Sequence, residues 1–349
     1  MASRPLKIAQ VLLSPRIGGA ETLAASLSHS WSVDGHESCV FYLDKTTGAA
    51  KRGRLRSLRK SIRSFGPDIV LAHSAIPNVF ARLATNSRVP VVTVLHSATD
   101  DYVELKLRLA ERALTRRTAG VVAVSATQRD DYARRFGSRL VTVIPNGLRH
   151  DLPVKSHYSS IPKEIVSVGR IARQKNPAQW LKIAQLLGGL VPPLEFKWFG
   201  PPSDEPEIPA IIKSGEDELH AQFCSPVADP GEILAKADIF LHTASREAHS
   251  IGILEAAAVG LPIVCSDTVA RTVPGIIRVY EYPDGDVVAA ARVIQALILS
   301  FDTANFSARE GASKVRREFD GMRCARSYLD LFEELEQREI STSRKKRLG

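Results

Sequence analysis

The sequence predicts an α/β protein that contains two doubly wound parallel sheets. Short runs rich in β-branched residues alternate with longer segments of helical periodicity along the whole chain. Several of the short runs are apolar throughout, which is typical of strands that are buried on both faces of a parallel sheet. The length of 349 residues matches about two domains. Two sheets of about six strands fit this length better than one sheet of twelve.

The predicted strands fall into two groups, one in each half of the chain. Those of the first half are Ile8–Leu13, Ser38–Leu43, Ile69–His73, Val91–His96, Val121–Ser125 and Leu140–Ile144. Those of the second half are Ile165–Gly169, Glu195–Phe199, Leu219–Cys224, Ile239–His242, Pro262–Cys265 and Ile277–Tyr280. A polar segment with two prolines, Leu148–Glu164, separates the groups. We therefore place the first domain at residues 1–152 and the second at 153–319.

Helical segments separate almost every pair of strands. The first helix follows Gly19, and its apolar residues Leu23, Leu27 and Trp31 recur in steps of four. The last helix spans about residues 320–338. One face of this last helix carries the apolar residues Tyr328, Leu331, Phe332 and Leu335. Residues 340–349 are basic, and we predict a disordered tail there.

The composition excludes several classes of protein. An apolar fraction of 44% and a charged fraction of 24% are ordinary for a globular protein and exclude collagen, coiled-coil rods and disordered chains. The longest segment without a charged residue, Ile69–Ala81, has 13 residues, whereas a membrane-spanning helix needs about 20. The four cysteines lie far apart and form no C-x-x-C pair, which favours free thiols in a reducing cytoplasm over disulfides or zinc.

The positive charge is concentrated in the first domain. Residues 1–152 hold 23 Lys and Arg against 12 Asp and Glu, whereas the remainder holds 24 against 26. No interleaved aromatics, helix-turn-helix signature or zinc-finger spacing accompanies this excess, so we expect no nucleic-acid partner. The basic segments Lys51–Phe65 and Tyr102–Arg117 also carry apolar residues at helical spacing, which favours contact with an anionic membrane. The alternative interpretation is that both apolar stripes face the core and the cations are solvated.

The first candidate motif, Ser14–Thr22, follows the first predicted strand directly. Gly18 and Gly19 let the backbone approach a ligand closely, and the helix after them presents its free N–H groups. Such a place can hold a phosphate or a sugar oxygen, although two glycines can also simply form a tight turn. The dinucleotide fingerprint G-x-G-x-x-G is absent, which counts against an NAD enzyme.

The second candidate motif is Ser167–Pro177, which begins in the first strand of the second domain. Gly169 ends this strand, and Arg170 and Lys175 follow where open α/β sheets deliver their ligand-binding loops. Two cations at this position suit a pyrophosphate. The alternative interpretation is two solvated surface cations.

The third candidate motif is Ser245–Pro262. Its sequence predicts a helix over Ile251–Val259, with Ser250 as N-cap and Gly260 after its last residue.

Two carboxylates flank the start of this helix. Glu247 precedes it and Glu255 lies in its second turn, where the apolar residues around Glu255 suggest burial. Carboxylates accept hydrogen bonds from sugar hydroxyls, and the amides near Ser250, Ile251 and Gly252 suit a phosphate. The motif therefore combines sugar recognition with phosphate recognition. The alternative interpretation of either glutamate alone is a solvated helix residue.

Together the three motifs resemble the retaining GT-B glycosyltransferases of family 4, which use nucleotide-sugar donors. The resemblance covers essentially the whole chain, and its motifs occur in the family's order: Gly18-Gly19-Ala20-Glu21, Val143-Ile144-Pro145-Asn146-Gly147, Val168-Gly169-Arg170, and Glu247 with Glu255. The two glutamates match the family's E-x7-E motif. The sequence departs from the family at Ala248 and His249, where Gly and an aromatic or apolar residue are usual, and at Ser97, where many members have Asp.

The resemblance implies two facing Rossmann-like domains, with the last helix crossing back to the N-terminal, acceptor-side domain. The second domain would bind the nucleotide-sugar donor. The implied catalytic residues are Arg170, Lys175, Glu247 and His96: the two cations hold the donor diphosphate, Glu247 binds the transferred sugar, and His96 lies near that sugar. The implied substrate-binding residues are Gly18, Gly19, Glu21, Asn146, Gly169, Ser250, Ile251, Gly252 and Glu255, with Glu255 on the ribose. No metal and no cofactor is implied.

We therefore expect a cytoplasmic enzyme, which could work at the inner face of the cytoplasmic membrane. It would move a hexose from a UDP- or GDP-sugar to a glycan or lipid-linked saccharide in cell-envelope polysaccharide synthesis, with retention at the anomeric carbon. Two alternatives remain open at this point: a nucleotide-sugar epimerase of the same fold, and a non-catalytic binding protein, which the departures at Ala248 and His249 keep in view.

Overall fold

The computed structural model describes residues 4–15, 18–43, 51–96, 102–137, 141–189 and 193–348. Contacts within the chain divide it into two units: unit 1 is Met1–His150 with Gly321–Gly349, and unit 2 is Asp151–Asp320. The sequence-based boundary at 152/153 lies just after this division. Arg16 and Ile17 of the first motif, Ser97 and Leu140 lie outside the described residues.

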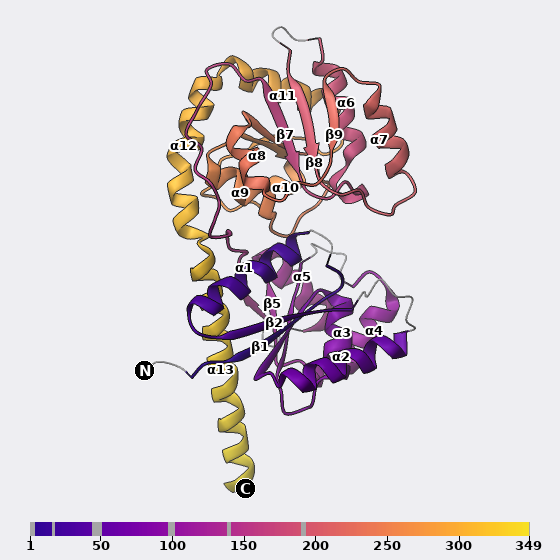
Figure 1. Cartoon of the computed structure of the whole chain (residues 1–349), viewed down its shortest axis with the longest axis vertical. Coiled ribbons are helices and arrows are strands. Elements are labelled where there is room, and N and C mark those ends of the chain that lie inside the picture. The colour runs from indigo at the N-terminus through magenta and orange to yellow at the C-terminus, as the bar shows by residue number, and fades with distance from the viewer. Residues whose placement is uncertain are drawn as a thin grey trace. The chain divides into compact units, whose positions relative to one another are not determined.

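Unit 1 is built on a parallel sheet of six strands with helices on its faces (Figure 1). Its strands are β1 (Lys7–Leu12), β2 (Glu37–Tyr42), β3 (Ile69–His73), β4 (Val91–Val94), β5 (Gly120–Ala123) and β6 (Val141–Val143). Its helices are α1 (Gly19–Val33), α2 (Lys51–Phe65), α3 (Ala75–Ala84), α4 (Leu105–Leu114), η1 (Thr115–Arg117), α5 (Ala126–Phe136) and α13 (Gly321–Leu348). The strands follow one another across the sheet in the order β2-β1-β3-β4-β5-β6.

Unit 2 is built on a second parallel sheet of six strands, in the order β12-β11-β10-β7-β8-β9. Its strands are β7 (Glu164–Val168), β8 (Glu195–Phe199), β9 (Ala221–Cys224), β10 (Ile239–His242), β11 (Ile263–Ser266) and β12 (Tyr280–Tyr282). Its helices are η2 (Arg173–Lys175), α6 (Pro177–Leu187), α7 (Ile208–Glu216), α8 (Pro230–Lys236), α9 (Ile251–Val259), α10 (Asp267–Ala270), α11 (Val287–Leu299) and α12 (Phe301–Glu318).

The predicted fold class is confirmed, since both sheets are parallel, six-stranded and covered by helices. Every predicted strand overlaps an observed one. The last predicted strand, Ile277–Tyr280, begins too early and shares only Tyr280 with β12, because Ile277 belongs to a turn in which its amide donates to the Pro274 carbonyl.

The first strand of each unit lies inside its sheet, and the chain leaves it toward both sides. In unit 2 the chain moves from β7 through β8 to β9, and then returns to the other side of β7 with β10. In unit 1 it moves from β1 to β2 and returns with β3 on the other side of β1. The connections therefore diverge between β7 and β10 in unit 2 and between β1 and β3 in unit 1. Open α/β sheets bind ligands at such a divergence point, at the carboxyl ends of the strands.

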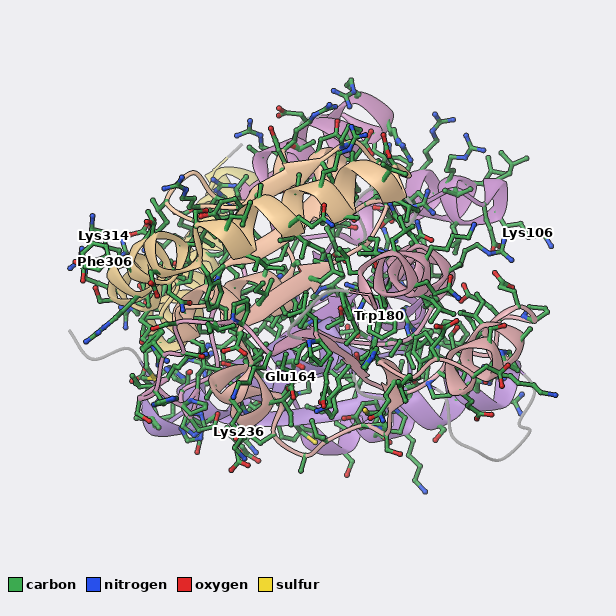
Figure 2. The ribbon with its side chains drawn as sticks, turned by 90° about the horizontal axis from the view of Figure 1, so that it is seen from above. Lys106, Glu164, Trp180, Lys236, Phe306 and Lys314 are labelled. Carbon is green, nitrogen blue, oxygen red and sulfur yellow. The ribbon has the colours of Figure 1, made fainter. Side chains whose placement is uncertain are left out.

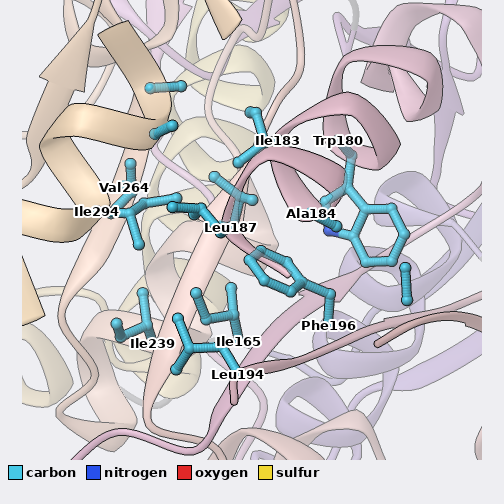
Figure 3. Packing of buried hydrophobic residues seen from close by; sticks show 14 of the residues in the cluster. Ile165, Trp180, Ile183, Ala184, Leu187, Leu194, Phe196, Ile239, Val264 and Ile294 are labelled. Atoms are coloured by element: carbon cyan, nitrogen blue, oxygen red, sulfur yellow. The ribbon is translucent and has the colours of Figure 1, made fainter. Parts of the chain in front are cut away.

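The core of unit 2 packs α6 and α11 against the sheet (Figure 3). Trp180 of α6 is fully buried and meets the ring of Phe196 edge-on at 6.1 Å between centroids. Burial of a large aromatic side chain contributes about 2–3 kcal/mol to stability. Figure 2 shows Trp180 inside the protein. Phe306 of α12, another aromatic residue of unit 2, instead lies at the surface near Lys314.

Unit 1 includes the last helix because α1 needs it for its core. Trp31 of α1 is fully buried and its indole N–H donates to the carbonyl of Ala325 at 3.1 Å. The rings of Tyr328 and Phe332 lie 6.2 and 6.0 Å from Trp31. A Cβ on Gly321 would overlap the carbonyl oxygen of Leu148, so only glycine allows α13 to begin at this position. The predicted apolar face of the last helix is buried, as expected.

The predicted disordered tail is wrong, because α13 continues to Leu348. Lys and Arg are good helix formers. The net charge of a segment at a helix C-terminus is therefore a poor sign of disorder.

The apolar stripe of α2 faces the core, in line with the plainer of the two interpretations. Leu58 and Ile62 are buried, and Leu55 and Phe65 pack against the same cluster as they do. The stripe of the other basic segment, on α4, behaves differently: Leu105 and Leu109 are 62% and 55% exposed.

Of the helices that the structure describes, none alone has both the length and the apolar character of a membrane span. One pair of consecutive helical segments is long and apolar enough when the two are taken together, but the pair is bent by 89°: Val287–Leu299 and Phe301–Arg338.

A buried ion pair joins the helices on one side of unit 1. Arg82 of α3 donates to Glu111 of α4 at 2.5 Å, and neither side chain is exposed. Glu111 also accepts hydrogen bonds from Asn78, Tyr102 and Tyr132 at 3.1, 3.1 and 2.6 Å. This carboxylate therefore connects α3, α4 and α5.

We expect Glu111→Ala to lower the free energy of unfolding by about 3–5 kcal/mol, because it leaves the buried Arg82 without its counter-charge. Urea unfolding followed by circular dichroism measures the change. Glu104→Ala, at the exposed start of the same helix, is the control and should change stability by less than about 0.5 kcal/mol. A loss below about 1 kcal/mol for Glu111→Ala would contradict the assigned role.

Candidate active site

Unit 2 gathers two of the predicted motifs at the carboxyl ends of β7 and β10. The second motif leaves β7 at Val168, and the third begins three residues after His242, the last residue of β10. The two strands are neighbours in the sheet, with Phe240 opposite Val166. Both motifs therefore lie at the divergence point of this sheet.

The turn after β7 depends on two glycines. Gly169 has φ +133°, a value that other residues rarely adopt. A Cβ on Gly200, which follows β8, would overlap the carbonyl oxygen of Gly169. The same carbonyl accepts a hydrogen bond from the indole N–H of Trp198 at 2.8 Å. This close approach fixes the direction in which the chain enters Arg170, whose side chain is exposed.

Hydrogen bonds hold the loop after β10 against the short helix η2. The Thr243 hydroxyl donates to the carbonyl of Lys175 at 2.8 Å. The Ser245 amide donates to the carbonyl of Gln174 at 3.1 Å, and the Gln174 side chain donates back to the carbonyl of Arg246 at 3.0 Å. These bonds join segments about seventy residues apart in sequence and bring Lys175 next to Glu247.

Lys175, His242, Glu247 and Ser250 form one polar cluster, which we call the Glu247 cluster. Lys175 Nζ donates to Glu247 Oε1, and His242 Nε2 lies 3.3 Å from the same oxygen. Ser250 Oγ lies 3.5 Å from His242 Nε2. The Glu247 side chain is 11% exposed and that of His242 is 5% exposed.

The Glu247 carboxyl is ionised in this cluster. Burial alone would raise its pKa, but the Lys175 charge and hydrogen bonds from His242 and Lys175 outweigh this and lower the pKa to about 2. Burial and the Lys175 charge lower the pKa of His242. An ionised carboxylate only accepts hydrogen bonds, so the neutral His242 ring carries its proton on Nε2. The cluster thus presents a fixed carboxylate next to a fixed cation.

Helix α9 begins beside this cluster, with the bounds that the sequence predicted. Ser250 is the N-cap and accepts the Ile253 amide at 3.4 Å, while Gly260 ends the helix in the left-handed region. A Cβ on Gly252 would lie 3.6 Å from the Val168 carbonyl oxygen, which places the first turn of α9 over the end of β7. Ser250 caps the Ile253 amide, so the first amides of α9 remain for an anion.

Glu255 occupies a more enclosed place than Glu247. It lies one turn into α9 and is 5% exposed. This fits the burial that its apolar neighbours suggested. The structure therefore brings Gly169, Arg170, Lys175, Glu247 and the α9 residues to one end of one sheet, and their roles toward a substrate stay predictions.

His96 lies in unit 1, two residues after β4, at the end of a relay of side chains. His96 Nε2 is 2.9 Å from His73 Nδ1, and His73 Nε2 is 2.9 Å from Gln10 Oε1. Gln10 donates its own amide to the carbonyl of Ala24 and to Ser28 Oγ at 2.9 and 2.8 Å. These donations orient the amide oxygen of Gln10 toward His73.

The relay determines where His96 holds its proton. Burial lowers the pKa of His96 to about 4 and that of His73 well below its ordinary value, so both rings are neutral at pH 7. An amide oxygen only accepts, so His73 donates from Nε2 and its Nδ1 accepts from His96 Nε2. His96 Nδ1 is therefore the unprotonated nitrogen of this ring.

The remaining predicted residues lie on two other segments of unit 1. Gly18 is the N-cap of α1 in extended backbone, and Gly19 and Glu21 form the first turn of α1. Neither glycine has the positive φ that would demand glycine, and a Cβ on Gly18 would meet only the flexible Glu21 carboxylate. Asn146 is buried in the segment after β6.

Sequence reasoning missed His242, Gly200, His73 and Gln10. His242 and His73 each end an apolar strand, and a titratable residue at the carboxyl end of a buried strand is the signal that could have found them. Gly200 follows a strand and precedes two prolines, a turn signal that was not followed up. Gln10 sits inside a strand, and nothing in its local sequence marks it.

Among the residues that the structure describes, no group of three or more His, Cys, Asp and Glu side chains is placed to hold a metal ion. Independence of metal stays a prediction.

Two family models match the chain, one on each unit. The model of Glycosyltransferase Family 4 matches residues 17–152, and that of Glycosyl transferases group 1 matches residues 152–304. Among curated protein sequences, none matches the chain significantly.

Several solved glycosyltransferase structures share the fold over almost the whole chain. HepE of Anabaena in complex with UDP and glucose has a TM-score of 0.77 at 17% identity and covers 94% of this chain and 99% of its own. Sucrose-phosphate synthase from Thermosynechococcus elongatus has a TM-score of 0.77 at 15% identity, with 95% and 99% covered. The pneumococcal O-GlcNAc transferase GtfA in complex with UDP and GlcNAc has a TM-score of 0.73 at 11% identity, with 95% and 99% covered. These likenesses show a GT-B fold.

We expect Glu247→Gln to destabilise the protein in a pH-dependent manner. The folded-state pKa of Glu247, about 2, lies below the ordinary 4.5, so the unfolded chain binds the proton more tightly. The stabilisation, about 3 kcal/mol, is complete above about pH 5 and is lost as the pH falls toward 2.

Urea unfolding at pH 7, 5 and 3.5 tests this expectation. The gap between wild type and Glu247→Gln should narrow as the pH falls. Glu310→Gln, on the exposed face of α12, is the matched control and should stay close to wild type throughout. A gap that is the same at all three pH values would show that the carboxylate charge is not what stabilises the cluster.

We expect His96 and His73 to remain neutral from pH 8 down to about pH 5, because burial disfavours their charged forms. Nitrogen-15 shifts of the imidazole rings should report a protonated Nε2 on both residues. Gln10→Leu removes the acceptor of His73 and should change the His73 tautomer or broaden its signals. Titration of His96 near pH 6.5 would contradict the relay.

Proposed function

Because the chain belongs to the group 1 glycosyltransferases of GT-B fold, we propose that it is a retaining hexosyltransferase. Its donor is a UDP- or GDP-hexose. Its acceptor is a hydroxyl of a glycan or lipid-linked saccharide in cell-envelope polysaccharide synthesis. Unit 2 binds the donor, and the family resemblance assigns the acceptor to unit 1.

The Glu247 cluster is the observation that carries this proposal. It places an ionised carboxylate and a cation side by side at the start of α9, where helix amides and the exposed Arg170 are also available. A nucleotide-sugar has a diphosphate next to a ring of hydroxyls. Amides, Arg170 and Lys175 suit the diphosphate, and Glu247 accepts from the sugar hydroxyls. Glu255 then takes the ribose hydroxyls.

The neighbours support a nucleotide-sugar donor. HepE and GtfA were solved with UDP and a sugar, glucose in one case and GlcNAc in the other. Their identity to this chain is low, so the base and the sugar for this chain are proposed on chemistry. The neutral His96 ring suits a position near a hydroxyl of the transferred sugar.

In the proposed reaction the bond from the anomeric carbon to the donor phosphate oxygen breaks. The acceptor hydroxyl oxygen forms its bond to that carbon on the same face. The acceptor proton passes to the departing phosphate oxygen, which leaves as part of the nucleoside diphosphate. Arg170, Lys175 and the α9 amides stabilise the charge that develops on this leaving group. We propose no metal and no cofactor for this step, so EDTA should leave the rate unchanged.

The excess of Lys and Arg in residues 1–152 supports a lipid-linked acceptor at an anionic membrane, on the inner face of the cytoplasmic membrane. This position is part of the proposal.

We expect one donor from a panel of UDP- and GDP-hexoses to raise the melting temperature and to be hydrolysed slowly without acceptor. Glu247→Ala or Lys175→Ala should lower the rate of nucleotide release by about 100-fold or more, because each removes charge stabilisation from the reacting donor. Glu255→Ala should mainly abolish the thermal shift. Glu310→Ala is the control and should keep both.

Three results would overturn the proposal. Near wild-type rates in Glu247→Ala or Lys175→Ala would remove the site assignment. A thermal shift without release of nucleotide, even with saccharide acceptors, would instead favour a non-catalytic binding protein. Conversion of the donor to a second nucleotide-sugar would indicate an epimerase.

A further inference from the structure

We propose that α4 and the end of α5 form a binding site for the phosphate headgroups of an anionic lipid surface. The observations are an exposed stripe on α4, a cavity lined by arginines, and a rigid aromatic wall of that cavity. The inference rests on the membrane part of the proposed function and is independent of the transfer reaction.

The exposed stripe of α4 alternates apolar and cationic side chains. Four residues of α4 share one face of the helix because they follow the spacing i, i+3, i+4, i+7: Leu105, Arg108, Leu109 and Arg112. The two leucines are more than half exposed, and the arginines are exposed as well. Lys106, next to Leu105, projects outward from the molecule (Figure 2). This face of α4 therefore presents apolar and positively charged side chains together, and they are exposed rather than packed into the core.

A cavity of about 530 Å³ opens beside this stripe. It is lined mainly by four arginines and two aromatic rings: Arg108, Arg112, Arg134, Arg135, Tyr102 and Phe136. Guanidinium groups bind phosphate through paired N–H donors, so several of them around one cavity favour a phosphate group.

The residues that line the described part of the cavity are, taken together, positively charged. Arg134 and Arg135 both pair with the Asp131 carboxylate, at 3.3 and 3.2 Å. In the described part of the chain, no ion pair is recorded for Arg108 or Arg112. Glu104, at the start of α4, is exposed and makes no cap hydrogen bond to the helix. Among the described residues that line the cavity there are thus four guanidinium groups and no carboxylate.

The wall of the cavity is fixed before any ligand binds. The Tyr102 hydroxyl donates to the buried Glu111 at 3.1 Å, and its ring meets that of Phe136 at 4.9 Å. Tyr132, whose hydroxyl also donates to Glu111, packs against both rings. A preorganised site loses less entropy when it binds a ligand.

The exposed apolar residues favour a lipid over a free anion as the occupant. Leu105, Leu109 and Val103, which also lines the cavity, are 62, 55 and 59% exposed. A free phosphate would use the arginines and leave these side chains in water. At a bilayer the phosphates meet the arginines while the apolar side chains enter the acyl boundary.

The test measures binding of the full chain to vesicles of phosphatidylcholine with about 30% phosphatidylglycerol at 150 mM salt. We expect R108Q/R112Q and L105Q/L109Q each to weaken binding by about tenfold or more. The matched control is R56Q/K60Q, which removes the same charge from the exposed side of α2 and should change binding less than twofold. Pure phosphatidylcholine vesicles should bind weakly.

Three outcomes would overturn the inference. Equal losses in R56Q/K60Q and R108Q/R112Q would indicate diffuse charge rather than a site. Unchanged binding in L105Q/L109Q, with a thermal shift from inorganic phosphate that R108Q/R112Q abolishes, would indicate a site for a free anion. No vesicle binding by wild type would exclude the lipid surface. Donor-induced thermal shifts should be unchanged in all three variants, which separates this inference from the proposed reaction.

Discussion

The position of the first strand inside each sheet controls where polar chemistry gathers in this protein. A parallel sheet buries its strands on both faces, so polar side chains that must meet a ligand can gather only where the strands end. Because the chain leaves β7 toward both sides of the sheet, the loops after β7 and β10 are not covered by a connection that crosses over them. Lys175 and Glu247 meet in that opening, and the cap of α9 follows from the same placement.

Both units place polar side chains at or near the carboxyl ends of parallel strands, but these side chains are charged in unit 2 and neutral in unit 1. In unit 2, burial would neutralise Glu247, but the adjacent Lys175 keeps it charged. In unit 1, burial lowers the pKa values of His73 and His96, so both rings stay neutral and are ordered by hydrogen bonds that start at Gln10. A charged pair can bind and stabilise a charged group, whereas a neutral ring takes part in hydrogen bonds without adding charge.

Local sequence predicted what depends on local physics. The strands, the bounds of α9 and the cap at Ser250 follow from periodicity and capping, which operate within a few residues. Lys175 and Glu247 were each singled out as candidate ligands, but their pairing depends on a crossover that joins segments 72 residues apart, and spacing does not reveal such a contact. Gln10 could not be found at all, because an interior strand residue gains a role only when β3 is placed beside β1. The helical tail was missed because charge was weighed above helix propensity.

The partnership of Trp31 with α13 also bears on the order in which the protein is made. The indole of Trp31 donates to a carbonyl 294 residues later in the chain, and all of unit 2 lies in between. A ribosome therefore completes unit 2 before it synthesises the helix that covers α1. The unit whose synthesis starts first is therefore the one whose core is completed last, because the contacts of Trp31 with α13 can form only after unit 2 has been synthesised.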